Sequence, residues 1–253
     1  MFTKAIVRRP CKNMTQGITS ANLGTPDYDK AVKQHNEYIE ALKKCGLDVT
    51  ILEANEKYPD SVFVEDVALL TPHCAIITNP GAASRQGEIE EMRKVLSEFY
   101  ENIEEIKSPG TIEAGDIMMV GSHFYIGLSA RTNKEGANQI INILNKNGMT
   151  GSTVTLEKVL HLKTGMSYLE NHNLVLSGEF LTKPEFQKFN ILKVDDDESY
   201  SSNCIWVNGT VLVPKGYPKS KSTIEKAGYK TIEVDVSEFR KLDGGLSCLS
   251  LRF

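Results

Sequence analysis

The side chains of this chain that are best suited to chemistry are one cysteine, one histidine and a small set of acids. Cys248 follows a turn that contains Gly244 and Gly245, and His161 lies between two leucines. A thiolate can attack an electrophilic carbon, and a histidine can supply or remove the proton that such an attack requires. Each residue alone also fits a buried structural position. Their roles therefore depend on what accompanies them.

Carboxylates and arginines indicate the two ends of a ligand. Glu65 and Asp66 occur within an apolar run, where an unpaired charge is costly, so a cation is expected beside them. Arg85 and Arg131 occupy matching loops of two successive repeats, where guanidinium groups could bind a carboxylate. Arginine or a derivative of arginine has a guanidinium at one end and a carboxylate at the other, and it fits both sets of residues.

The elements that must position these residues follow a repeated order of strand, turn, strand, loop, helix and strand. The Asn208-Gly209 pair between two apolar runs is the strongest hairpin signal in the pattern. Four copies are complete, and the fifth is split between the tail Ser247–Leu251 and the N-terminal stretch Ala5–Leu52. Such sharing would close a ring of five repeats. An ordinary doubly wound sheet is the alternative, but the hairpins favour mixed sheets, and no G-x-G-x-x-G or P-loop motif opens a helix.

The pattern predicts the bounds of most elements. The expected strands besides the tail are Lys4–Arg8, Asp48–Leu52, Val64–Leu70, Cys74–Thr78, Ile103–Ile106, Ile117–Val120, Phe124–Leu128, Thr153–Leu156, Ser167–Leu169, Leu174–Leu176, Ile191–Val194, Ile205–Val207, Thr210–Val213 and Thr231–Val234. The expected helices are one that Thr25 caps and Gly46 ends, Glu88–Tyr100, Glu135–Asn147, a short one around Pro184–Phe189, and Ser220–Lys226.

Reactive residues recur at one position of this repeat, at or just before the first strand. The residues at this position are Glu65 and Asp66, Glu113 and Asp116, His161, Asn203, and Cys248. If the repeats surround an axis, equivalent positions meet near it. The sequence therefore predicts that carboxylates, a histidine and a cysteine share one site.

Composition excludes several classes of function. The net charge is -4 without a long basic or acidic run, which argues against binding to nucleic acid or to an anionic membrane. No stretch is apolar enough for a membrane helix, and the start of the chain lacks the features of a signal peptide. The five cysteines are widely spaced and odd in number, which favours a reduced, cytoplasmic protein without a structural zinc site.

The quoted residues give the chain a resemblance to the dimethylarginine dimethylaminohydrolases of the pentein (amidinotransferase-like) superfamily, in their bacterial form. The matching stretches run almost from end to end: Pro59–Asp66, Gly81–Arg85, Glu113–Ile117, Gly127–Asn133, Leu160–Thr164, Asn203–Ile205 and Asp243–Cys248. The resemblance implies a five-bladed α/β propeller of ββαβ units, with residues 1–253 as a single catalytic domain. It also implies hydrolysis of N-ω-methylated arginines to citrulline and methylamine or dimethylamine.

The resemblance also implies the role of each site residue. Cys248 would be the nucleophile, His161 the general acid and base, and Glu113 the residue that orients His161. Asp66 would hold the guanidinium, and Arg85 and Arg131 would bind the substrate carboxylate. The remaining residues implied to line the substrate site are Ile18, Asp60, Glu65 and Leu242. No metal or organic cofactor is implied, the partner is a small-molecule substrate, and the family suggests a homodimer.

Other functions remain open at the level of sequence. Arginine deiminase resembles this layout but usually carries an extra helical domain, for which 253 residues leave no room. Agmatine deiminase acts on a substrate without a carboxylate, which would leave Arg85 and Arg131 without a partner. An amidinotransferase would need an amine acceptor instead of water. A non-catalytic arginine-binding protein is disfavoured by the complete set of cysteine, histidine and carboxylates.

Overall fold

The computed structural model describes residues 1–253, and its strands form five separate three-stranded sheets. In each sheet the middle strand pairs antiparallel with one neighbour and parallel with the other. An antiparallel pair can be joined by a tight turn, whereas a parallel pair needs a longer crossover. This requirement produces the order of strand, turn, strand, crossover and strand that the sequence repeats.

The chain divides into two compact units, which we describe separately. The central unit is Glu65–Thr164, and the terminal unit comprises Met1–Val64 with Gly165–Phe253. The central unit holds two sheets, whose elements are β3 (Ala68–Leu70), β4 (Ala75–Ile77), α2 (Ile89–Leu96) and β5 (Ile103–Glu105), then β6 (Ile117–Val120), β7 (His123–Leu128), α3 (Lys134–Lys146) and β8 (Thr150–Thr155).

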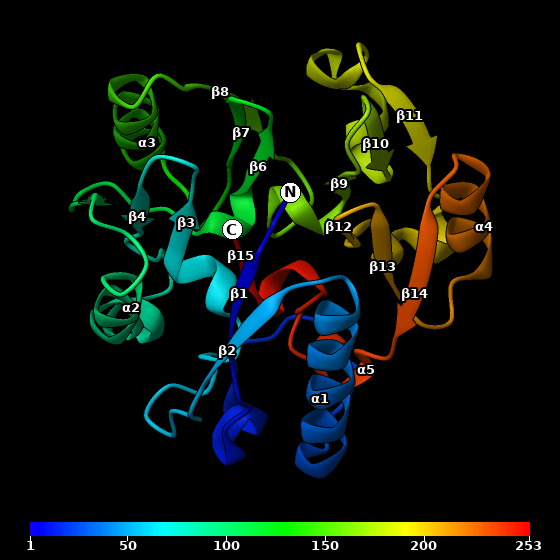
Figure 1. Cartoon of the computed structure of the whole chain (residues 1–253), viewed down its shortest axis with the longest axis horizontal. Helices are drawn as coiled ribbons and strands as arrows, with labels where there is room; N and C mark the ends of the chain where they lie inside the picture. The colour runs from blue at the N-terminus through cyan, green and yellow to red at the C-terminus, as the bar shows by residue number, and fades with distance from the viewer. The chain divides into compact units, whose positions relative to one another are not determined.

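The terminal unit holds the other three sheets (Figure 1). Its elements in chain order are β1 (Lys4–Arg8), η1 (Lys12–Gln16), α1 (Tyr28–Lys44), β2 (Asp48–Leu52), β9 (Met166–Tyr168), β10 (Asn173–Leu176), η6 (Gly178–Thr182), η7 (Pro184–Phe186), β11 (Asn190–Lys193), β12 (Ile205–Val207), β13 (Thr210–Pro214), α4 (Pro218–Lys226), β14 (Lys230–Val234), α5 (Ser237–Arg240) and β15 (Leu251–Arg252).

The two ends of the chain share one sheet of the terminal unit, as predicted. Strand β15 pairs antiparallel with β1, which in turn pairs parallel with β2. The backbone of Phe253 extends this pairing, because its carbonyl accepts from the N–H groups of Thr3 and Lys4, both at 2.8 Å. Figure 1 shows the two chain ends close to this strand pair. The last residues are therefore part of the fold rather than a free tail.

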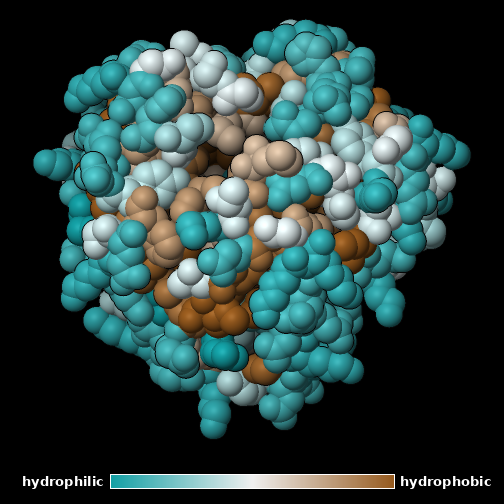
Figure 2. All heavy atoms as spheres, in the orientation of Figure 1, coloured by the Kyte–Doolittle hydropathy of each residue, from teal (hydrophilic) through white to brown (hydrophobic).

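Each unit is built around buried apolar side chains of its own. In the central unit, Ala137, Ile140 and Leu144 on one face of α3 belong to a cluster with Phe124 and Ile126 of β7. Both strand residues project to the same side of their sheet because they are two positions apart. The opposite faces of α1 and α3 are hydrophilic in Figure 2, as expected of helices that cover a sheet on one side only.

A short 3-10 helix lies just before the strand that pairs antiparallel with the middle strand of every sheet. These turns are η2 (Val64–Val67), η4 (Ala114–Asp116), η5 (Leu162–Thr164), η8 (Asp196–Ser202) and η9 (Ser247–Leu249). The predicted strand Val64–Leu70 is wrong in its first half, because pairing begins only at Ala68. The predicted strand Ser247–Leu251 is wrong for the same reason, since Cys248 lies in η9.

The chemistry of the side chains explains why these segments turn. In an extended strand, Glu65 and Asp66 would point to opposite faces of the sheet, and one carboxylate would enter the apolar core. In η2 both acids instead reach cationic partners, Lys163 and Arg85. The turn is thus the conformation in which two adjacent buried charges are both paired.

Three helix predictions also differ from the structure. Asp27, and not Thr25, caps α1: its backbone is extended and its side chain accepts from the Lys30 N–H at 2.9 Å. The helix expected at Glu88–Tyr100 is shorter, because Glu88 belongs to η3 (Ala83–Glu88) and α2 ends at Leu96. The short helix expected around Pro184–Phe189 is the single 3-10 turn η7, which ends at Phe186. No helix in the chain is long and apolar enough to span a membrane.

Candidate active site

Glu113 and His161 form the hydrogen-bonded pair at the centre of the candidate site in the central unit. The Glu113 backbone is extended and begins η4, and its Oε2 lies 2.9 Å from His161 Nε2. Its other oxygen, Oε1, accepts from the Ala82 N–H at 2.9 Å. Because both oxygens are engaged and the carboxylate is buried, its orientation is fixed. It can therefore fix the orientation of the histidine ring in turn.

His161 carries a raised pKa. Burial alone would lower the pKa of this imidazole, but the hydrogen bond to Glu113 and the negative charges of Asp66 and Asp116 outweigh that effect and raise the pKa to about 9. The ring is thus protonated near neutral pH before a substrate binds. A group in this state is suited to donate a proton to a leaving group.

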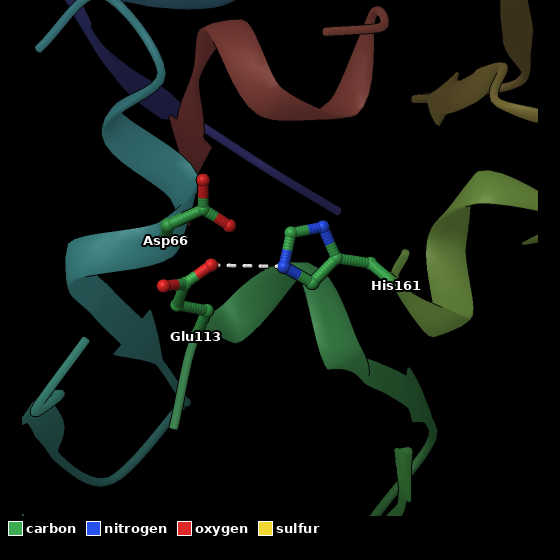
Figure 3. A group of neighbouring side chains, drawn as sticks. All are labelled: Asp66, Glu113 and His161. Atoms are coloured by element: carbon green, nitrogen blue, oxygen red, sulfur yellow. Dashed lines mark hydrogen bonds and ion pairs between the residues drawn. The ribbon is translucent and has the colours of Figure 1, made fainter. Parts of the chain in front are cut away.

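Asp66 faces the same ring from η2 (Figure 3). Its Oδ2 lies 2.5 Å from the Arg85 guanidinium, and its Oδ1 accepts from the Gly115 N–H at 3.2 Å. Burial alone would raise the pKa of Asp66, but Arg85 and His161 hold the pKa below its ordinary range. A side chain at position 115 would have no room, since a Cβ there would lie 2.8 Å from Asp66 Oδ1 and 3.2 Å from His161 Cγ.

Arg85 is buried between two acids. Its Nη1 contacts Asp66, while Nε and Nη2 donate to the two oxygens of Glu88 at 3.0 and 2.9 Å. Burial alone would lower the pKa of Arg85, but the negative charges of Glu88 and Asp66 raise it well above its ordinary value. The side chain is only 6% exposed. It is therefore held inside the central unit by a two-sided ion pair.

Arg131 differs from Arg85 although the two occupy matching loops. Its side chain is 22% exposed, and its Nη1 lies 3.9 Å from Glu113 Oε1. The backbone of Arg131 is fixed more firmly, because its N–H donates to Ser129 Oγ at 3.0 Å.

Glu65, the neighbour of Asp66, is buried and lies 2.5 Å from Lys163 Nζ. The central unit thus holds six of the predicted site residues, namely Glu65, Asp66, Arg85, Glu113, Arg131 and His161.

Cys248 lies in the terminal unit, in the turn η9. Its Sγ accepts from the Gly245 N–H at 3.4 Å. The turn is held by Asn203, whose Oδ1 accepts from the Ser247 N–H at 2.9 Å and whose Nδ2 donates to Ser247 Oγ at 3.0 Å. Tyr200 Oη donates to the Gly244 carbonyl at 2.8 Å. The cysteine is therefore half-buried on a backbone that two side chains restrain.

Three predicted substrate-lining residues meet around Gly17 of the terminal unit. The Asp60 carboxylate accepts from the Ile18 N–H at 3.0 and 3.3 Å. A Cβ at Gly17 would lie 2.6 Å from Asp60 Oδ1 and 3.3 Å from Leu242 Cδ2. Glycine at this position therefore lets the Ile18 backbone approach both side chains.

Asp66, Glu113 and His161 also have the donor types of a metal site. Their ligand atoms all lie within 4.8 Å of one another. The carboxylates already have cationic partners, however, because Arg85 contacts Asp66 and the imidazole contacts Glu113. A metal ion would have to displace a proton from His161 and compete with a guanidinium. The arrangement fits acid–base chemistry on a cationic ligand better than metal binding.

Sequence reasoning missed the partners that hold these residues. It did not identify Glu88, Lys163 or Ser247 as members of the site. The spacing Arg85-x-x-Glu88 is a detectable signal, because residues three apart are neighbours on a helical turn. The contact between Lys163 and Glu65 spans 98 residues of sequence and has no local signal.

Comparison with known proteins identifies the family. The family model described as "N,N dimethylarginine dimethylhydrolase, eukaryotic" matches residues 18–201 of the chain. The chain is also 58% identical to N(G),N(G)-dimethylarginine dimethylaminohydrolase of Pseudomonas aeruginosa, over 100% of both chains. The chain belongs to the dimethylarginine dimethylaminohydrolase family. The resemblance noted from the sequence motifs is confirmed.

Solved structures of family members match the whole chain. One is a cysteine-to-serine variant from Pseudomonas aeruginosa complexed with citrulline, with a TM-score of 0.99 at 58% identity over 100% of both chains. Another is a dimethylarginine dimethylaminohydrolase histidine-to-glycine variant as an adduct with S-methyl-L-thiocitrulline, with the same TM-score, identity and coverage. The predicted α/β pentein fold of the family, with five repeated units and the ends of the chain sharing the fifth, is confirmed.

Proposed function

We propose that this protein hydrolyses N-ω-methylated L-arginines to L-citrulline and dimethylamine or methylamine. Membership of the dimethylarginine dimethylaminohydrolase family supports the reaction. The citrulline complex of the Pseudomonas aeruginosa variant supports citrulline as the product, and the S-methyl-L-thiocitrulline adduct of a dimethylarginine dimethylaminohydrolase variant supports an adduct with a citrulline-like compound. The observation that carries the proposal is the His161–Glu113 hydrogen bond beside the Asp66 carboxylate, in a chain of this family.

The first half of the proposed reaction forms a bond to sulfur. The Cys248 thiolate attacks the guanidinium carbon, and the C–N bond to the methylated nitrogen breaks. His161 donates a proton to the departing amine, which leaves a covalent thiouronium on Cys248. Because Nε2 is engaged by Glu113, the proton exchanges through Nδ1, which points away from both acids in Figure 3.

The second half of the reaction releases citrulline. His161, now neutral, takes a proton from a water molecule, and the resulting hydroxide attacks the thiouronium carbon. The C–S bond then breaks, the proton of the added hydroxyl passes to the solvent, where the free amine can take it up, citrulline leaves, and the Cys248 thiolate is regenerated. Glu113 stabilises the imidazolium whenever it forms, since its carboxylate remains hydrogen-bonded to Nε2. The positive charge of the bound substrate favours the thiolate in each cycle.

The proposed substrate contacts follow from charge. Asp66 holds the guanidinium, because each carboxylate oxygen can accept a further hydrogen bond beside those from Arg85 and Gly115. Arg131 binds the substrate carboxylate with its partly exposed guanidinium. Arg85 is proposed to bind the substrate carboxylate as well. To do so, its guanidinium would exchange or share one of its contacts with Asp66 and Glu88. Ile18, Asp60, Glu65 and Leu242 are proposed to line the site.

The test is citrulline formation from asymmetric dimethylarginine, monomethylarginine, arginine and agmatine, measured side by side. The methylated arginines are expected to be preferred, and a preference for agmatine or unmodified arginine would overturn the proposal. Cys248→Ser should abolish turnover with every substrate. The matched control is Cys45→Ser, at the other partly exposed cysteine, which should keep normal turnover.

The compartment, the domain organisation and the assembly of the protein are proposed from three different observations. All five cysteines are free, which fits a reducing compartment such as the cytoplasm. We propose that the two units act as a single catalytic domain, because the predicted catalytic residues are divided between them. A homodimer is proposed from the family resemblance, and sedimentation of the purified protein tests it.

A further inference from the structure

Asp116 is a fully buried acid for which the proposed reaction has no use. It lies in η4 with an exposed fraction of 0%. Its Oδ1 accepts from the Leu162 N–H at 3.0 Å, and its Oδ2 accepts from Ser129 Oγ at 2.7 Å. Leu162 follows His161 directly in sequence. Asp116 therefore holds the backbone that carries the proposed acid and base.

The second partner of Asp116 is Ser129, which belongs to the loop that carries Arg131. Ser129 Oγ donates to Asp116 and accepts from the N–H groups of Arg131 at 3.0 Å and Thr132 at 3.1 Å. Thr132 Oγ1 in turn accepts from the Glu113 N–H at 3.2 Å. One carboxylate and one hydroxyl thus connect the backbones of the proposed general acid, its orienting glutamate and the proposed carboxylate-binding arginine.

The packing around Asp116 leaves no freedom to rearrange. A Cβ at Gly127 would lie 3.2 Å from Asp116 Oδ1 and 3.1 Å from Leu162 Cβ. A buried carboxylate that lost a donor could not be rehydrated in such a space, so both hydrogen bonds must be kept. Its charge also acts on the imidazole, which faces Asp66 of η2 as well as Glu113 and Asp116 of the η4 segment.

We propose that Asp116 is a positioning residue for the reaction, which holds His161 through Leu162 and Arg131 through Ser129. The inference rests on the proposed function for its kinetic consequences, but the hydrogen bonds themselves are a property of the fold. One oxygen of Asp116 accepts from the Leu162 N–H, next to His161, and the other accepts from Ser129, which holds the Arg131 backbone. Variants that change these two hydrogen bonds to different extents should therefore affect kcat and KM differently.

The variant Asp116→Asn tests the whole connection. Asparagine has the same shape but a single acceptor oxygen, so either the Leu162 N–H or the Ser129 hydroxyl loses its acceptor. We expect kcat with dimethylarginine to fall roughly tenfold or more and KM to rise several-fold. The pKa of His161, followed by NMR of its ring, should fall because a nearby negative charge is lost.

The variant Ser129→Ala tests the Ser129 hydroxyl while the Leu162 N–H keeps its acceptor. It removes the shared acceptor of the Arg131 and Thr132 N–H groups and one of the donors to Asp116. KM should rise by about tenfold, and kcat should fall less than in Asp116→Asn, because the Leu162 N–H keeps its bond to Asp116. If Asp116→Asn does not fold, this variant still decides the matter, since a normal KM would contradict the proposal.

The matched control is Glu198→Gln in the terminal unit. Glu198 is also a buried acid that accepts from backbone N–H groups and from a serine hydroxyl, at Lys219 and Ser220. This variant should lose stability without a change in kcat, KM or the pKa of His161. If Asp116→Asn behaves in the same way, Asp116 is merely structural and the proposal is overturned.

The failure of the proposed function would be recognised separately. If the wild-type protein does not convert methylated arginines, the proposed reaction is wrong. The ring titration of His161 in wild type and in Asp116→Asn still reports whether Asp116 acts on His161. An unchanged pKa of His161 in a folded Asp116→Asn protein would overturn that part of the inference.

Discussion

The Arg85 guanidinium is shared between two buried carboxylates, and this sharing has an energetic consequence. The side chains of Arg85, Asp66 and Glu88 are at most 7% exposed. Removing the guanidinium from such a group takes a shared cation away from two buried carboxylates. That loss costs far more than the loss of an ion pair in water, because the remaining charges cannot be solvated.

We therefore predict that Arg85→Met destabilises the protein by roughly 3–5 kcal/mol. The matched control is Arg93→Met, which breaks an Arg–Glu contact of the same length, 2.9 Å, in the same unit. Both partners of that contact, Arg93 and Glu105, are about one third exposed, so a loss of no more than about 1 kcal/mol is expected. Denaturant unfolding measures both values. Equal losses would contradict the prediction.

The raised pKa of His161 makes a contribution to stability that depends on pH. A folded-state pKa of about 9, above the ordinary value of 6.5, means that the folded protein binds the proton more tightly than the unfolded chain. This contribution is complete below about pH 6.5, and it is lost as the pH rises through about 9.

The comparison of wild type with His161→Gln isolates this contribution, because the other titrating groups cancel. We predict that the difference in free energy of unfolding shrinks by roughly 3 kcal/mol between pH 6 and pH 10. Denaturant titrations at a series of pH values measure this difference. Parallel stability curves for the two proteins would show that the pKa of His161 is not raised.

At the scale of elements, the sequence predicted the sheets well and the segments before them poorly. Strands such as Lys4–Arg8 and Ile117–Val120 have the predicted bounds, because apolar periodicity reports burial on a sheet. The segment Val64–Val67 has equally apolar neighbours but forms a 3-10 turn. What bends it is the pairing of Glu65 and Asp66 with distant cations, which no local pattern records.

The same distinction applies to the candidate site. The residue types and their matching places in the repeat selected Glu65, Asp66, Glu113, Asp116, His161, Asn203 and Cys248 as candidates, and the family resemblance implied the roles of Cys248, His161, Glu113 and Asp66. The residues that contact these buried acids could not be selected from the repeat in the same way. Ser129 and Lys163, for example, lie 13 and 98 residues from the acids that they contact. Such contacts depend on the tertiary fold rather than on the local sequence.

The start of α1 gives a test at this scale. Thr25 and Asp27 are both acceptable cap residues by type, but only the Asp27 side chain accepts from an N–H of the first turn. Asp27→Ala should therefore destabilise the protein by about 1 kcal/mol. Thr25→Ala should change the free energy of unfolding by less than about 0.5 kcal/mol, as for an ordinary exposed position. Chemical denaturation distinguishes the two, and the reverse order would restore Thr25 as the cap.

At the scale of the whole molecule, the proposed catalytic residues are divided between two compact units. Cys248 belongs to the terminal unit, while His161, Glu113 and Asp66 belong to the central unit. A single catalytic domain requires that the two units fold together. Independent folding of the units would instead produce two transitions.

We predict one cooperative unfolding transition. Trp206 is the single tryptophan and lies in β12, so its fluorescence reports the terminal unit. The ring signals of His161 and His123 report the central unit by NMR. The two probes should give the same midpoint in urea. Separate midpoints would mean that the units are independent domains, and that the proposal of one domain is wrong.

The five 3-10 turns have a consequence for how such a protein can change over evolution. Asp66, Glu113, His161 and Cys248 all lie outside the paired residues of their sheets, which begin at Ala68, Ile117, Met166 and Leu251. Exchanging one of these four side chains removes no hydrogen bond between strands. Selection or design can therefore install a different acid, base or nucleophile at one turn at a time, while the sheets that support the turns are inherited unchanged.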